Sequence, residues 1–258
     1  MPINDYKEIT IPVSGIDKAV KKIEDANGNI IWGSQSAFPY RRLEYIHFNG
    51  AEYINTGLQG SSVKWWQIQV SFDSYSSSSD LFCSYTNSVA AARQRFYIGR
   101  ANNSSKMQFA LGSTWSNSTI TVPLDNKLTI NCRTIQSGNN TTLYFNIKDK
   151  DETQLVNSSV ASATGTTSSN GKNLFLMANN NNDNGAERFS TGKIYLLIQR
   201  NDSSSGTLEF NGIPCQRKSD GVCGLYDTIN GVFKPMQGTT TTSSAAGPVI
   251  DEYWDLTA

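Results

Sequence analysis

Short apolar runs that alternate with polar side chains recur along most of this chain. Within residues 65–72 (WWQIQVSF), the apolar residues Ile68, Val70 and Phe72 alternate with polar ones. This period of two is typical of a strand with one buried face. Comparable β-branched or aromatic runs begin near positions 95, 107, 128, 142, 174 and 193, and clusters of Ser, Asn and Gly separate them as turns.

Helical patterns are scarce by comparison. No segment carries a sustained apolar stripe with a period of 3.6, and the best helical candidate, residues 87–95 (NSVAAARQR), is short. Many strands joined by polar turns predict an all-β sandwich or barrel. A chain of 258 residues is long enough to bury one substantial core in that form.

The two ends of the chain break this pattern. Residues 1–36 place Asn27-Gly28 between apolar flanks, which predicts a β-hairpin with a type I′ turn. An isolated hairpin is marginal in water, so we expect it to dock on the main domain or on another chain. The last residues, 249–258, form a tail whose Tyr253 and Trp254 should pack against a neighbour. We therefore divide the chain into an N-terminal segment (1–36), a main domain (37–248) and a tail (249–258).

Charge and composition exclude several classes of partner. Lys and Arg total 22, as do Asp and Glu, so the net charge is zero and gives no electrostatic basis for binding nucleic acid or an anionic membrane. No apolar run approaches the roughly 20 residues of a membrane-spanning helix, and the start of the chain shows no secretory signal. Ser and Asn make up about a fifth of the chain. Aromatic residues make up 10%, too many for a disordered protein.

Catalytic and metal-binding motifs are not evident. His47 is the only histidine, and its strand-like context (YIHF) favours a structural role. The cysteines Cys83, Cys132, Cys215 and Cys223 lack zinc-site spacing. Free buried thiols are the default expectation, although Cys215 and Cys223 flank a turn and could pair across a hairpin.

Two groups of motifs stand out near the two ends of the main domain. The first group is RLEYI at 42–46 with Gly50, Tyr53-Ile54 and Thr56-Gly57. The second is FSTGKIY at 189–195, IPCQRKSDGVCGLYD at 213–227, Asn230 and Phe233. Together they resemble phage and prophage structural proteins that carry a laminin-G/concanavalin A-like jelly-roll domain. The resemblance covers roughly residues 38–248, but residues 60–170 match only as strands. Val232-Phe233-Lys234 and the Thr-rich tract after it depart from the usual closing run.

This resemblance implies a concanavalin-like (LamG) jelly-roll β-sandwich, preceded by a small β-hairpin segment for attachment to the virion. The protein would be a head fibre, capsid decoration or tail-fibre component, made in the bacterial cytoplasm and displayed on the particle surface. Residues 1–36 would contact other virion proteins or promote oligomerisation, and a homotrimer is favoured.

The most specific motifs have a structural interpretation. Two turns, one ending at Gly221 and one at Asn230-Gly231, would close the sandwich, with residues 42–45 as the partner edge. We assign this structural role to Arg217, Asp220, Gly221, Gly224, Tyr226, Asp227, Asn230 and Gly231.

Ligand-binding residues are expected elsewhere, because sugars need aromatic faces and amide or charged partners for their hydroxyls. Neighbours in a strand face opposite ways, so either Trp65 or Trp66 should point outward, to contact a ligand or subunit or to pack under a loop. The Asn-rich segment 179–184 is expected to be a loop, and its Asp183 is a weak candidate calcium ligand. The candidate ligand-binding residues are Trp65, Trp66, Trp115, Tyr75, Tyr85, Asn181 and Asp183.

Three functions are compatible with these features. The first is a virion protein that binds host-surface or environmental glycans through a lectin-like sandwich, and the second is an assembly protein without a ligand. The third, a glycan depolymerase, is disfavoured because hydrolysis uses paired carboxylates. Here the acidic residues Asp149, Asp151 and Glu152 crowd into one turn, while Glu187 and Glu209 stand alone. We expect no enzymatic activity, and no cofactor unless calcium binds.

Overall fold

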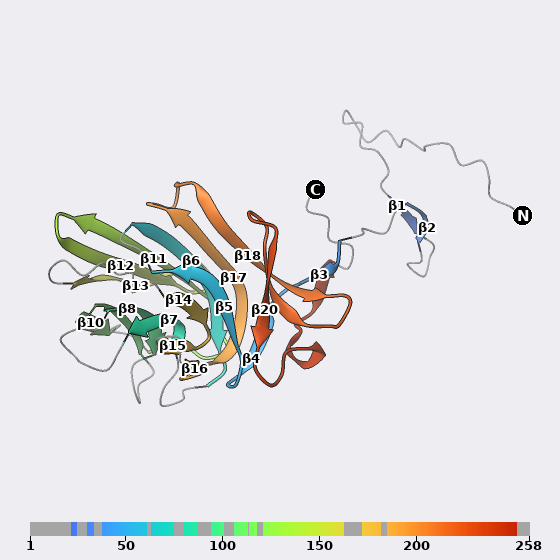
Figure 1. Cartoon of the computed structure of the whole chain (residues 1–258), viewed down its shortest axis with the longest axis horizontal. Helices are drawn as coiled ribbons and strands as arrows, with labels where there is room; N and C mark the ends of the chain where they lie inside the picture. The colour runs from blue at the N-terminus through green and yellow to red at the C-terminus, as the bar shows by residue number, and fades with distance from the viewer. Residues whose placement is uncertain are drawn as a thin grey trace, which may run out of the picture.

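The computed structural model confirms an all-β sandwich (Figure 1). It describes residues 22–24, 30–33, 38–60, 63–74, 80–86, 94–100, 106–112, 114–117, 121–162, 172–181 and 185–251. These residues include no helix with the length and apolar character needed to cross a bilayer. Of the segment expected to be helical, residues 87–93 lie outside this description, and the following residues begin strand β8.

The first sheet contains the longest strands. Its order is β13–β12–β11–β6–β17–β18–β19–β20, all antiparallel, with β4 beside β17 and with β3 and β21 beyond β18. The strands are β3 Tyr40–Leu43, β4 Ile46–Asn49, β6 Lys64–Phe72, β11 Leu128–Ser137, β12 Asn140–Lys148, β13 Gln154–Ser162, β17 Thr191–Asn201, β18 Leu208–Arg217, β19 Cys223–Asp227, β20 Val232–Gln237 and β21 Val249–Asp251.

The second sheet runs β10–β9–β8–β7–β14–β5 and joins the first through β20, which pairs with both β19 and β5. A short strand, β15, lies parallel to β7 and pairs with β16. The strands are β5 Tyr53–Gln59, β7 Asp80–Thr86, β8 Gln94–Arg100, β9 Met107–Leu111, β10 Thr114–Asn117, β14 Asn173–Leu176, β15 Asn179–Asn181 and β16 Ala186–Glu187. A 3-10 turn spans Ser243–Ala245.

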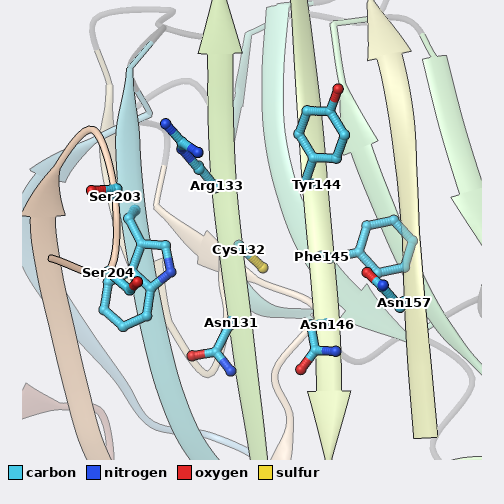
Figure 2. A pocket seen from close by; sticks show the side chains of 10 residues that line it. Asn131, Cys132, Arg133, Tyr144, Phe145, Asn146, Asn157, Ser203 and Ser204 are labelled. Atoms are coloured by element: carbon cyan, nitrogen blue, oxygen red, sulfur yellow. The ribbon is translucent and has the colours of Figure 1, made fainter. Parts of the chain in front are cut away.

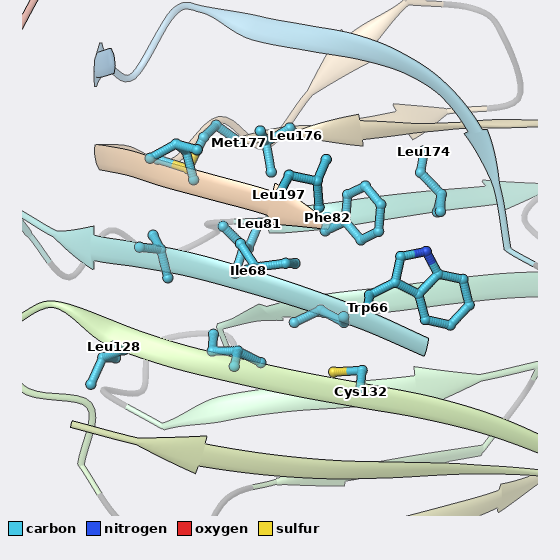
Figure 3. Close-up of a cluster of buried hydrophobic side chains, with 14 of the residues drawn as sticks. Trp66, Ile68, Leu81, Phe82, Leu128, Cys132, Leu174, Leu176, Met177 and Leu197 are labelled. Atoms are coloured by element: carbon cyan, nitrogen blue, oxygen red, sulfur yellow. The ribbon is translucent and has the colours of Figure 1, made fainter. Parts of the chain in front are cut away.

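One apolar core lies between the two sheets. Trp66, Ile68 and Leu197 enter it from the first sheet, and Phe82 and Leu176 enter it from the second (Figure 3). The alternation in β6 therefore has the predicted result, because every second residue from Trp66 to Phe72 is buried.

The predicted N-terminal hairpin is also present. β1 (Lys22–Glu24) and β2 (Ile30–Gly33) pair antiparallel in a two-stranded sheet of their own. At the other end, β21 pairs with β3, so the sandwich continues past the expected boundary at residue 248.

The closing strands, which we define as β3, β18, β19 and β20, bring the two ends of the main domain together. β3 pairs with β18, as predicted for the motif at 42–45. Gly221 and Gly231 adopt φ angles of 73° and 67°, the left-handed conformation predicted for their turns.

A disulfide between Cys215 and Cys223 is excluded by the register of β18 and β19. Cys223 lies opposite Gln216, while Cys215 lies opposite Gly224. Because successive residues face opposite sides of a sheet, the two thiols point away from each other. Cys223 belongs to the main core, whereas Cys215 packs with Tyr226 in a separate cluster. All four cysteines are free and buried.

Candidate functional site

Trp65 and Trp66 face opposite sides of the first sheet, as the strand pattern predicted. Trp66 is fully buried in the core and donates a hydrogen bond from Nε1 to Gln199 Oε1 at 2.9 Å. Its assignment as a ligand-binding residue is therefore wrong, since no ligand can reach it. Trp65 is half-buried on the outer side and stays a candidate.

The register of three strands aligns Trp65 with two residues that the sequence analysis did not select. Trp65 of β6 lies directly opposite Arg133 of β11, and Arg133 lies opposite Tyr144 of β12. Tyr144 is 46% exposed, which is unusual for a tyrosine in the middle of a sheet. Two aromatic side chains thus flank one guanidinium on the outer side of the sheet.

A second row of side chains runs beside the first and consists of amides. Gln67, Asn131, Asn146 and Asn157 occupy successive strands β6, β11, β12 and β13 at directly paired positions. Figure 2 shows Asn131 and Asn146 at one level of the strands, with Arg133 and Tyr144 at the next. We call these two rows the amide face; it comprises Trp65, Gln67, Asn131, Arg133, Tyr144, Asn146 and Asn157.

All residues of the amide face except Gln67 line a hollow of about 190 Å³. Ser203 and Ser204, from the turn between β17 and β18, form its rim beside Trp65. No Asp or Glu side chain is among the residues that line it.

Hydrogen bonds to neighbouring side chains engage some polar atoms of the amide row and leave others able to bind a ligand. Gln67 Nε2 donates to Asn131 Oδ1 at 3.1 Å, and Asn146 Nδ2 donates to Gln154 Oε1 at 2.8 Å. Asn131 Nδ2 and Asn146 Oδ1 have no partner among the described residues. A donor and an acceptor are therefore presented side by side, the combination that a sugar hydroxyl requires.

Arg133 is held in place from one side. Its Nε donates to the backbone carbonyl of Asp202, and its Nη2 donates to Asp202 Oδ1, both at 2.7 Å. Asp202 occupies the turn after β17 with a φ of 58°, so the turn that forms the rim also orients the guanidinium.

The Asn-rich segment differs from the expected loop. Asn179–Asn181 form strand β15, in which Asn179 and Asn180 are buried. The half-buried Asn181 donates from Nδ2 to Glu187 Oε2 at 3.1 Å. The loop assignment is therefore wrong for these three residues, because their backbone pairs with β7 and β16 as a short strand.

The other sequence candidates are not brought to the amide face. The backbone of Tyr85 lies in β7, paired with Asn181, and that of Trp115 lies in β10, both in the second sheet. The side chains of Tyr85 and Trp115, and all of Tyr75 and Asp183, fall outside the described residues. Within the described ranges no group of three His, Cys, Asp or Glu residues could hold a metal ion.

A second hollow, of about 270 Å³, lies on the first sheet where β3, β6, β17 and β18 meet. Its one aromatic residue, Tyr195, is covered by Lys127, whose Nζ lies 4.8 Å from the ring centroid. Arg42, Glu44 and the exposed Ile250 complete a mixed lining without an amide row. This hollow lacks an aromatic face available to a sugar.

No protein-family model and no curated protein matches the sequence. Among solved structures, the chain is similar to a candidate carbohydrate-binding protein from Bacteroides ovatus, with a TM-score of 0.50 and 12% identity. That match covers 91% of this chain and 68% of the other. The enzymatically active domain of tailspike protein 2 from bacteriophage CBA120 matches at a TM-score of 0.45 and 11% identity, covering 63% of this chain and 25% of that one. The first likeness supports the β-sandwich fold.

Proposed function

We propose that this chain is a phage virion structural protein whose sandwich binds glycans at the amide face. The observation that carries the proposal is the pair of aligned rows, Trp65–Arg133–Tyr144 beside Gln67–Asn131–Asn146–Asn157, whose members other than Gln67 line one hollow. Similarity to a candidate carbohydrate-binding protein agrees with it at the level of the fold.

The two rows match the two surfaces of a sugar. The apolar face of a pyranose ring stacks on an aromatic side chain, here Trp65 or Tyr144, while its hydroxyls need paired donors and acceptors. Because the row residues stand on regular strands, little conformational entropy is lost on binding. A single shallow hollow gives weak affinity, and many copies on a particle would supply avidity.

The virion role rests on the sequence motifs of the closing strands and on the N-terminal hairpin. We propose that residues 1–36 attach the sandwich to other virion proteins and that the assembly is a homotrimer exposed on the particle surface. Head fibre, capsid decoration and tail-fibre component are all compatible with this arrangement.

We propose that the site is non-catalytic. Glycoside hydrolysis generally uses two carboxylates that flank the scissile bond, and the residues lining the hollow include none. His47 is engaged elsewhere, with its Nε2 2.6 Å from Asp73 Oδ2. Release of reducing ends from a bound polysaccharide would overturn this part of the proposal.

Binding of the full chain, presented multivalently, to a glycan array and to host cells tests the proposal. We expect saturable binding that falls about fivefold or more in Trp65→Ala and Tyr144→Ala, since stacking of a ligand ring on an aromatic side chain contributes about 1–3 kcal/mol. Tyr195→Ala is the matched control, because it removes a tyrosine from the same sheet outside the amide face. Absence of binding would favour the ligand-free assembly protein, and binding unchanged by the variants would place the site elsewhere.

A further inference from the structure

We propose that the amide face selects sugars that carry a carboxylate, such as uronic or sialic acids, and that Arg133 is the residue that binds this group. The inference rests on the proposed function, because it names the class of glycan for the same hollow. It starts from the charge distribution around Trp65.

Among the described residues, Arg133 is the only one with a charged side chain that lines the hollow. It stands between the two aromatic rings, so a sugar stacked on either ring would place its substituents next to the guanidinium. An arginine side chain is charged at every physiological pH, and its planar fork matches a carboxylate.

The contacts to Asp202 leave part of that fork available. They use one N–H of Nε and one of Nη2, out of the five that a guanidinium carries. Nη1 has no hydrogen-bond partner among the described residues. The Asp202 side chain is 62% exposed, so water weakens its neutralising effect on Arg133.

A second guanidinium increases the local positive charge. Arg200 of β17 lies opposite Trp65 on the side away from Arg133, so Trp65 is flanked by two arginines. Arg200 donates from Nη1 to the carbonyl of Gly206 at 3.0 Å and forms no ion pair in the described part of the chain. Nearby Lys64 and Glu209 neutralise each other at 2.6 Å. Apart from that pair, the surroundings of Trp65 hold two guanidiniums, those of Arg133 and Arg200, and one carboxylate, that of Asp202, although the whole protein carries no net charge.

The test compares matched neutral and acidic ligands, such as glucose and glucuronic acid oligosaccharides of equal length, on the full chain. We expect the acidic ligand to bind about tenfold more tightly, the value of one charge-assisted hydrogen bond. The preference should shrink with added salt, because the site is open to solvent.

Two arginine variants separate the anion-binding role from stacking and folding. Arg133→Gln should bring the ratio of the affinities for the acidic and the neutral ligand down to about one, whatever its effect on either affinity alone. Arg200→Gln, which removes no donor to Asp202, should reduce the preference only partly, and Arg217→Gln in the closing strands should not change it. Equal binding of both ligands by the wild type, or a preference that survives Arg133→Gln, would overturn this inference. A failure of the proposed function would look different: neither ligand would bind, or Trp65→Ala would bind normally.

Discussion

The closing strands and the amide face belong to the same sheet but use their polar side chains in opposite ways. In the closing strands polar groups are paired internally: Asp227, 2% exposed, accepts from the backbone N–H groups of Asn211 and Ile229. On the amide face, Asn131, Arg133 and Asn146 each keep polar atoms without a partner among the described residues.

This difference suits the closing strands to stabilising the fold and the amide face to binding a ligand. A buried carboxylate that satisfies backbone donors stabilises one turn and offers nothing to a ligand. Half-exposed amides and aromatic rings on a rigid sheet contribute less to folding and can exchange water for a sugar. The motifs that resemble a protein family lie in the closing strands and in the neighbouring strands β5 and β17, and they report the fold, while the candidate chemistry lies where the sequence matches only as strands.

The largest expected effect comes from replacing neighbouring tryptophans on opposite sides of β6. Trp66→Ala should lower the free energy of unfolding by about 3–5 kcal/mol, because it empties part of the core and removes the hydrogen-bond donor to Gln199. Trp65→Ala should cost about 1 kcal/mol or less, as expected for a half-buried surface residue. Urea denaturation followed by circular dichroism measures both, and equal losses would contradict the assignment of opposite faces.

Asp227→Ala should have the next largest effect. It leaves two backbone N–H groups and the Asn230 amide without their acceptor, which should lower the free energy of unfolding by about 3 kcal/mol. Asp227→Asn keeps one oxygen acceptor and should lose less. Glycan binding by the folded fraction should be unchanged in both variants, and a loss of binding would break the separation between the two regions.

Alkaline pH should weaken the closing strands through a buried thiol. Burial raises the pKa of Cys223 from 9.0 to about 11. Between these values the unfolded chain loses its proton first, so stability should fall as pH rises from 9 to 11, by up to about 1.4 kcal/mol per pH unit. Cys223→Ala should make the profile of unfolding free energy against pH less steep in this window, while the other three buried thiols, whose pKa values burial also raises, still contribute. An unchanged profile would show that Cys223 does not control it.

Cys132, which lies behind the amide face, is the matched comparison for that experiment. Burial raises the pKa of its thiol further than that of Cys223. Its contribution should therefore extend above pH 11, where that of Cys223 ends, and Cys132→Ala should still make the profile less steep there.

Local patterns in the sequence were sufficient for the strands, the turns and the burial of every second residue. The alternation in β6 predicted that Trp65 and Trp66 face opposite ways, and Asn230-Gly231 marked its turn correctly. β1 and β2 pair as predicted, while the turn expected at Asn27-Gly28 lies outside the described residues. These features depend on the period of a strand and on residues that tolerate positive φ, both of which are properties of neighbouring residues.

The amide face could not be predicted in the same way, because it depends on the register between distant strands. Trp65 and Tyr144 are far apart in the chain. They lie on either side of Arg133 only because β11 lies between their strands and Arg133 is paired with both of them. A shift of one residue in either pairing would send one ring into the core. The same limitation explains the error at Asn179–Asn181, where pairing with β7 turned a polar run into a strand.

The smallest expected effect is that of Asp220→Asn, on the exposed rim of the closing strands. Asp220 Oδ2 accepts from Arg217 Nη2 at 2.6 Å and Oδ1 accepts from the backbone of Val222 at 3.1 Å. These two contacts lower the pKa of Asp220, so their stabilisation is present at neutral pH and is lost as pH falls through that lowered pKa. Asparagine retains an oxygen for Val222, and Arg217 keeps its contact with the Phe233 ring at 5.2 Å, so only the charge is lost. We expect a small drop in the urea midpoint at pH 7 that disappears in acid, since water screens an exposed ion pair. A loss of stability as large as that of Asp227→Ala would mean that the exposed Arg217–Asp220 ion pair, and not the buried carboxylate of Asp227, stabilises the closing strands.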